Sequence, residues 1–264
     1  FLSGLESDLV KILNDNKDLS PGKKAKLETI LKAAGSAIDS TYQAIGKQHA
    51  GDMAGLAKAQ SAAAGKMLNH AIGVDVFGAV LTGSQLASVA GDTAVFGHSS
   101  GDWWASQSSQ LRFKFAGQMK QGYALGEDVD ALVRRVRGTK AGQFKDGIMQ
   151  ASRREAEALV RSSIQTISNE ARLKSFAALG DTIKGIEWVA TLDTRTTVIC
   201  RALDGLVWTV PDLKPVGHAK VFPGPTAHWN CRSTQIPVLR SWAELSGKPI
   251  KALDGQTMEA KLKA

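Results

Sequence analysis

The sequence predicts an α+β protein, with a mainly α-helical N-terminal and central body and a small C-terminal α+β unit of a few short strands. Two observations predict this fold class. Apolar residues recur at intervals of three and four through most of residues 1–180, which is the spacing of one helical face. From about residue 181, apolar and polar residues alternate between prolines and glycines, as is typical of short strands joined by loops.

Length and composition restrict the class of protein further. The chain has 264 residues, of which 43% are hydrophobic, so it is long enough for one large domain or two small ones. No run of about 18 apolar residues occurs, so we expect no membrane span. The chain starts with Phe1, so we expect it to begin within a longer product or after processing, and the charges among its first residues do not predict a signal peptide there. Two cysteines are too few for a disulfide framework, which favours a reducing compartment such as the bacterial cytoplasm during assembly.

The first predicted domain, residues 1–105, is helical and rich in alanine and ends in a glycine-rich connection. A first helix carries leucines on one face, at Leu2, Leu5, Leu9 and Leu13. Ser20-Pro21 is expected to be the N-cap and first residue of the next helix. That helix continues the apolar spacing through Leu27, Ile30, Leu31, Ala34 and Ile38. Recurrent glycines over 74–105 predict loops or short broken helices.

The second predicted domain, residues 106–240, begins with three helices. Trp103 and Trp104, just before it, are expected to anchor a core. A helix through Leu111, Phe115 and Met119 should break at the glycines of 122–126. A short helix should follow, with apolar positions at Ala131, Leu132 and Val136. The clearest helix, which Gly180 should terminate, has its predicted apolar face at Ala156, Val160, Ile164, Ile167 and Ala171.

The remainder of this domain is the predicted α+β unit. Strands are expected at 186–192, 206–210 and 233–239, and Pro237 should confine the last of them to a sheet edge. A cap and short helix should lie at 193–200. Residues 241–264 are predicted to form a C-terminal helix and tail.

A basic stretch gives the strongest charge signal. The chain has 33 Lys and Arg against 25 Asp and Glu, a net charge of +8. Its cations gather, with only Asp146 among them to oppose the charge, at Arg134, Arg135, Arg137, Lys140, Lys145, Arg153 and Arg154. Such a stretch predicts contact with the phosphate backbone of double-stranded DNA without sequence preference. Two alternatives to DNA contact are a binding site for an acidic protein surface and a helix face that is simply exposed to solvent.

Three residues have the types and spacing of zinc ligands. Cys200 lies about 30 residues before His228-Trp-Asn-Cys231, and a His-x-x-Cys pair suits one half of a zinc site. Asp193, Asp204 and His218 are the candidates for a fourth ligand. Two alternatives remain, namely buried cysteines that act as small apolar side chains, and a disulfide between them. With zinc as the only candidate, no other cofactor is expected.

Enzyme chemistry has little support. Asp193, Asp204, His218 and His228 are the residue types of a hydrolytic metal site. No HExxH, GxSxG or P-loop motif is present, however, and the aspartates fall at predicted turns, where they are common as local hydrogen-bond acceptors. We therefore expect no enzyme.

A motif runs through the C-terminal half, after the Arg- and Ala-rich helix 156–172. Its marked residues, in order, are Trp188, Asp193, Arg195, Cys200, Asp204, Gly205, Pro223, Pro225, His228, Cys231 and Arg232. In order and spacing, residues 150–240 resemble the phage Mu F-like family of minor head proteins, also called phage head morphogenesis proteins. Three positions depart from the family pattern. Thr197 and Ser233 stand where many members have cysteine, so a four-thiolate site cannot form, and Trp229 replaces a proline.

The resemblance implies a structural minor head protein inside the head of a tailed phage. The expected place is near the portal vertex, after assembly in the host cytoplasm, with a role in head morphogenesis and in DNA packaging or delivery. The portal protein and other capsid proteins are the implied partners, together with self-association. The motif residues taken as structural are Trp188, Asp193, Arg195, Asp204, Gly205 and Arg232. Among them, the Asp193 carboxylate is expected to cap a turn, and the Arg195 guanidinium is expected to bridge neighbouring loops. Two alternatives stay open: a nonspecific DNA-binding virion protein ejected with the genome, and a zinc-dependent hydrolase.

Overall fold

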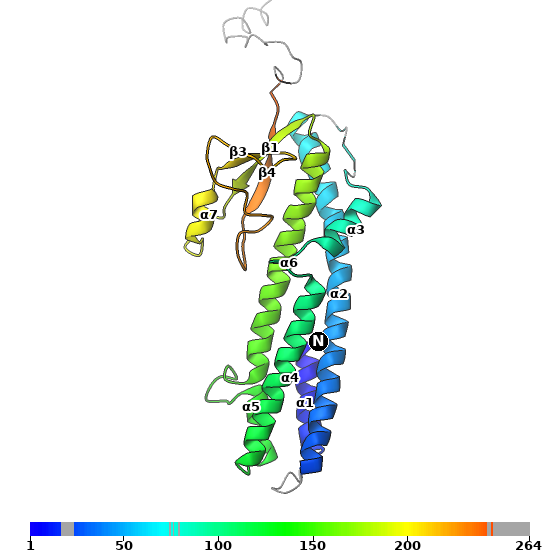
Figure 1. The fold of residues 1–264 in the computed structure, drawn as a ribbon, viewed down its shortest axis with the longest axis vertical. Helices are drawn as coiled ribbons and strands as arrows, with labels where there is room; N and C mark the ends of the chain where they lie inside the picture. Colours follow the sequence, from blue (N-terminus) through cyan, green and yellow to red (C-terminus); the bar gives the residue numbers. More distant parts are fainter. Residues whose placement is uncertain (17–23, 74, 76, 79, 242–243, 245–264) are drawn as a thin grey trace, which may run out of the picture. The chain divides into compact units, whose positions relative to one another are not determined.

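The computed structural model describes residues 1–16, 24–73, 75, 77–78, 80–241 and 244 (Figure 1). The helices are α1 (Leu2–Asn14), α2 (Lys24–Ile72), α3 (Gly83–Asp92), α4 (Ser100–Ala124), α5 (Val129–Arg137), α6 (Ile148–Ala178) and α7 (Val198–Leu203). The strands are β1 (Ile183–Val189), β2 (Val207–Thr209), β3 (Pro215–Val216) and β4 (Thr234–Leu239). The predicted α+β class, with helices first and a small sheet last, is confirmed.

The chain forms two compact units. The helical unit comprises residues 1–60, 82–171 and 225–231. The sheet unit comprises residues 61–81, 172–224 and the described residues from Arg232 onward. The units therefore divide the chain along other lines than the predicted domains 1–105, 106–240 and 241–264, which stay a prediction. The Ser20-Pro21 cap and nearly all of the predicted C-terminal helix and tail lie outside the described residues.

The helical unit has one apolar core. Leu5, Leu9 and Leu13 of α1 are 1% exposed or less, so the predicted leucine face is confirmed. Figure 1 shows α1, α2 and α4 running side by side. Their buried side chains form a single cluster with those of α5 and the first half of α6. Trp104 is buried in this cluster, as expected of a core anchor, and Trp103 packs on it with its indole N–H donating to the Val95 carbonyl at 2.7 Å.

Local capping explains where the helices of this unit begin. Thr82 with Gln85, and Ser99 with Asp102, form reciprocal capping boxes at α3 and α4. Asp128 accepts from the Ala131 N–H at 2.7 Å and caps α5. The predicted break at 122–126 is confirmed, because α4 ends at Ala124 and Gly126 follows with a φ of 66°. Gly122 itself lies within the helix, and α5 packs closely against it there.

The predicted apolar face of α6 is correct only in part. Ala156, Ile167 and Ala171 are buried, whereas Ile164 is 41% exposed. Along this stretch the buried face is polar instead, at Ser162, Ser163, Thr166 and Asn169. A spacing rule that counts only apolar residues cannot find a buried face of this kind.

The sheet unit contains an antiparallel sheet in the order β3-β2-β1-β4. Ile186 of β1 pairs with Trp208 of β2, and Trp188 and Trp208 are both fully buried. A Cβ at Gly185 would lie 2.6 Å from the Trp208 carbonyl oxygen, so β1 requires glycine there. β4 is an edge strand, which confirms the place predicted for Pro237. The two-residue strand β3 has too few residues to show alternation and was missed.

Candidate metal site and basic surface

Segment 225–231 of the helical unit carries two of the predicted metal ligands, and α6 holds it in place. The hydroxyls of Thr166 and Thr226 hydrogen-bond at 3.0 Å. The Asn169 amide donates to the Pro225 carbonyl at 2.7 Å. The Asn230 N–H donates to the Ser162 hydroxyl at 3.0 Å. These bonds account for the polar face of α6: its small hydroxyl and amide side chains satisfy a loop backbone that would otherwise be buried without partners.

Trp229, which stands where the family pattern has proline, supplies an apolar anchor for the same segment. Its ring lies 4.7 Å from that of Phe96 and 5.2 Å from that of Trp103, measured between ring centroids. Aromatic pairs at such distances add to stability beyond the area that they bury. The tryptophan at position 229 therefore packs this loop against Phe96 and the first turn of α4.

His228 and Cys231 are set by a tight turn. The Cys231 N–H donates to the His228 carbonyl at 3.1 Å, and Asn230 has a φ of 57° in the left-handed region that asparagine tolerates. The His228 Nδ1 lies 2.9 Å from the Trp229 carbonyl oxygen. Because a carbonyl only accepts, Nδ1 donates the hydrogen in this bond.

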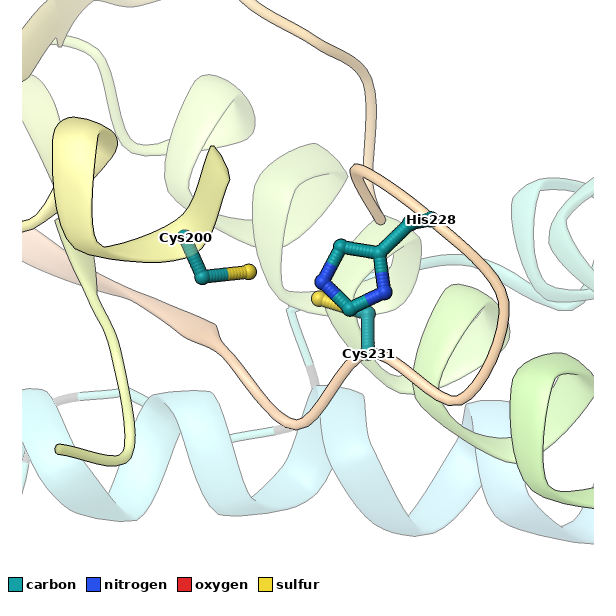
Figure 2. A group of neighbouring side chains, drawn as sticks. All are labelled: Cys200, His228 and Cys231. Carbon is teal, nitrogen blue, oxygen red and sulfur yellow. The ribbon is translucent and has the colours of Figure 1, made fainter. Parts of the chain in front are cut away.

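Cys200 lies in the first turn of α7. Thr197 is the N-cap of this helix, and its hydroxyl accepts from the Cys200 N–H at 3.3 Å. Figure 2 shows Cys200, His228 and Cys231 as a group of neighbouring side chains. One ligand atom from each residue lies within 4.8 Å of the others, and both thiols are buried and reduced. Among the described residues, this is the one cluster of three metal-ligating side chains.

The predicted fourth ligands have other roles. Asp204 accepts from the Ala190 N–H at 2.7 Å. The His218 Nε2 lies 2.9 Å from the Val207 carbonyl, and its Nδ1 accepts from the Lys220 N–H at 3.2 Å. Neither residue joins the cluster. A hydrolytic site built from these side chains together with Asp193 is therefore not assembled in this structure.

Asp193 instead forms an ion pair with Arg232. Both carboxylate oxygens accept from the guanidinium at 2.6 Å, and the Arg195 N–H adds a bond of 2.9 Å. The arginine lowers the pKa of Asp193 well below its usual range. The predicted turn-capping role of Asp193 thus agrees with the geometry. The predicted bridging role of Arg195 does not, because its guanidinium is 78% exposed and 3.8 Å from that carboxylate, and Arg232 makes the bridge.

Several cations of the basic stretch form ion pairs within the protein and are therefore not available to bind a partner. Arg135 forms a two-point pair with Glu127 at 2.6 and 2.7 Å, which lowers the pKa of that glutamate. Arg137 and Arg153 both bind Glu6 of α1, at 3.1 and 2.7 Å. Three of the seven cations therefore hold helices together. Their acidic partners lie outside the stretch, so counting charges within it could not reveal them.

The other four cations of the stretch are exposed, at Arg134, Lys140, Lys145 and Arg154. In the part of the chain that the structure describes, none of them has an acidic group within 4.0 Å. Phe144, between two of them, is 52% exposed. We call these four residues the basic surface.

Exposed apolar side chains mark a feature that the sequence did not single out. Leu192, Val198 and Ile199 lie within eight residues of each other and are 67%, 80% and 53% exposed. They belong to the turn before α7 and to its first residues. Helical periodicity gave no signal here, because α7 has only six residues.

One comparison with known proteins finds a match. Part of the chain, from within α4 onward, matches the model of a family of phage head morphogenesis proteins. The family is described as Phage Mu protein F like protein, and its model matches residues 114–236. The resemblance found in the sequence is thereby confirmed. The match runs from within α4 to within β4. No curated protein and no solved structure matches the chain.

A search of the described helices for membrane spans gives a negative result. None combines the length and the hydrophobicity that crossing a bilayer requires.

Proposed function

We propose that this protein is a minor head protein of a tailed phage, bound at the portal vertex in the interior of the head. It acts in head morphogenesis and in the packaging or delivery of DNA, and it is assembled in the host cytoplasm. Its role is structural and not enzymatic. The observation that carries the proposal is the Mu F-like match over 114–236, which includes the anchored segment 225–231 and most of the sheet.

The exposed apolar residues around α7 support a docking role. Clustered exposed apolar side chains on a soluble protein mark sites of protein–protein contact. Leu192, Val198 and Ile199 are such a group, next to the Asp193–Arg232 pair that fixes their turn. We therefore propose this segment as the surface that binds the portal protein.

Co-sedimentation with the portal protein from the same gene cluster tests the proposal. We expect binding that persists at high salt, because burial of apolar side chains is little screened by ions. The double variant Val198→Ser/Ile199→Ser should lose most of it. Phe113→Ser is the matched control, since Phe113 is 82% exposed on α4. Absence of binding at both low and high salt, with every variant folded, would contradict portal docking.

A second function, contact with packaged DNA, is favoured by the basic surface. Its four cations have no acidic partner among the described residues, and backbone phosphates bind such groups without sequence preference. DNA affinity without any portal affinity would favour a DNA-binding protein that leaves with the genome.

A further inference from the structure

We propose that the connection between α5 and α6, residues 138–147, inserts into duplex DNA. The Phe144 ring enters a step between two base pairs, and the side chains of Lys140 and Lys145 bind phosphates on either side of it. We call residues 138–147 the insertion loop. This mode of binding rests on the DNA contact proposed above and deepens it by naming the residue that enters the double helix.

The two ends of the insertion loop are joined by hydrogen bonds, so its shape is set before any partner binds. The Asp146 carboxylate accepts from the Thr139 hydroxyl and from the Thr139 N–H, each at 2.7 Å, and these two bonds lower the pKa of the aspartate. The same hydroxyl accepts from the Gly142 N–H at 3.0 Å, and the Thr139 carbonyl accepts from the Phe144 N–H at 2.8 Å. A loop that is ordered in advance loses less conformational entropy on binding.

Close packing within the loop supports the same conclusion. A Cβ at Gly142 would lie 2.6 Å from the Asp146 carboxylate, and one at Gly147 would lie 2.3 Å from the Gly138 backbone nitrogen. Both distances are shorter than real side chains make, so the loop has no room for larger residues at these positions. Figure 1 shows this connection as a loop at the side of α5 and α6. The compact loop is therefore a rigid support for the side chains that it exposes.

Phe144 lies in an exposed turn of this loop. The Lys145 N–H donates to the Gly142 carbonyl at 3.0 Å, and the two residues between them, Gln143 and Phe144, have φ values of 52° and 59°. This left-handed region is unfavourable for large side chains. The Phe144 side chain is also 52% exposed, so burial in the folded chain offsets little of that cost. A strained and exposed phenylalanine therefore indicates a partner that covers the ring.

The charge of the loop fits a phosphate backbone. Lys140 and Lys145 are exposed, and among the described residues neither has an acidic group within 4.0 Å. Asp146 is the one acidic residue of the loop, and two hydrogen bonds within the loop already occupy it. Arg134 of α5 and Arg154 of α6 extend the basic surface. Cations that bind phosphates, next to an apolar side chain that enters a base step, are the two parts of an inserting DNA contact.

The surroundings of the ring favour DNA over a membrane or an apolar protein surface. Sites for those partners gather several exposed apolar side chains in one patch. Phe144 instead has polar neighbours in sequence, Gln143 and Lys145, and both are exposed. A single ring on a narrow turn fits the gap between two base pairs, where aromatic side chains stack on any base. We therefore expect a preference only for easily deformed steps such as TA.

The first test measures bending and unstacking of DNA by the full-length chain. The probe is a short GC-rich duplex with a single TA step and a dye at each end. Binding should raise the energy transfer between the dyes, because an inserted side chain kinks the duplex. In a second duplex, 2-aminopurine replaces the adenine of the TA step. Its fluorescence should rise on binding, because this base brightens when it loses its stacked neighbour.

Variants separate the ring from the charges. Phe144→Ala should weaken duplex binding about tenfold and abolish both signals, with an unchanged salt dependence because the phosphate contacts remain. Phe144→Trp should keep both signals. Lys140→Ala/Lys145→Ala should instead reduce the salt slope by about 1.8. Phe113→Ala is the matched control, since Phe113 is 82% exposed on α4, and it should behave as wild type. Circular dichroism checks the folding of each variant.

Three outcomes would overturn the insertion. If folded Phe144→Ala binds, bends and brightens DNA as wild type does, the ring stays outside the double helix. If the wild-type chain binds duplex DNA but leaves it straight and stacked, the proposed DNA contact stands and the insertion alone is wrong. If the wild-type chain binds phosphatidylglycerol vesicles through Phe144 and no duplex at any salt concentration, both are wrong and the ring enters a lipid surface. Should variants fail to fold, the bending and 2-aminopurine signals of the wild-type chain still decide.

Discussion

Single residues of the motif act mainly by fixing turns. Asp193 and Arg232 are far apart in sequence, yet they form a two-point pair at 2.6 Å that connects the turn after β1 to the start of β4. The motif marked both residues as structural, but it assigned the bridge to Arg195. Asp193 accepts from the backbone N–H of Arg195 at 2.9 Å, whereas the Arg195 guanidinium is 78% exposed and 3.8 Å from the carboxylate.

The pair predicts how stability depends on pH. The pKa of Asp193 is lowered in the folded protein, so its contribution is complete above the ordinary aspartate pKa of about 3.9. It is lost as the pH falls through the lower, folded value. We therefore expect Asp193→Asn to lower the melting temperature at pH 7, and the difference from wild type to shrink as the pH falls from about 4 toward 2. Thermal melts from pH 7 to pH 2 measure this.

Asp212→Asn is the control, since Asp212 pairs only with its exposed neighbour Lys214. A loss in Asp193→Asn that stays constant down to pH 2 would show that the carboxylate does not act through its charge.

At the scale of elements, helix spacing and caps predict most of the helices. α1, α5 and the apolar positions of α4 follow from sequence because each has an apolar stripe and a clear boundary. The close approach of α4 and α5 does not follow. A Cβ at Gly122 would lie 2.3 Å from the Leu132 side chain, so this glycine is a packing residue and does not break the helix.

Two glycines of α4 give a matched pair of variants. Gly122→Ala should cost about 1–3 kcal/mol, because the added methyl group overpacks the contact with α5. Gly117→Ala should gain about 0.5–1 kcal/mol, since alanine favours helix and no atom lies within 4 Å of the new Cβ. Urea denaturation measures both. Equal effects from the two substitutions would show that α5 does not pack at this position.

At the scale of the whole molecule, α1 and α2 share the core of the helical unit with the Mu F-like helices. Leu5, Ile30 and Ile38 are in one cluster with Leu111 and Phe115. The N-terminal region is therefore part of the same folding unit as the start of the matched segment, although it carries no family signal itself.

This shared core predicts that residues 1–73 cannot be removed without loss of structure. The deletion uncovers the buried faces of α4 and α5, so the remaining chain should lose helix and aggregate. Circular dichroism and light scattering measure this, and a 1–73 fragment added in trans should restore part of the helix. A truncated chain that stays monomeric with its full remaining helicity would contradict a shared core.

DNA binding is the second prediction at this scale. If each of the four cations of the basic surface neutralises one phosphate, the logarithm of the DNA-binding constant should fall with the logarithm of the salt concentration at a slope of about −3.6 on duplex DNA. These cations are Arg134, Lys140, Lys145 and Arg154. Substituting all four with alanine should remove most of the affinity. A variant with four other exposed lysines replaced (Lys32, Lys47, Lys58 and Lys120) has the same net charge. Equal losses in both variants would show that only net charge matters.

The sequence by itself determined the fold class, most helix positions and the resemblance to the Mu F-like family, because periodicity, caps and motif spacing are local properties of the chain. Tertiary structure decided the rest. It paired three of the seven cations with Glu6 and Glu127, gave α6 a polar buried face, and excluded Asp204 and His218 from the metal cluster. Each of these features depends on contacts between side chains that are far apart in the sequence. Such contacts are set only when the helices and strands pack together.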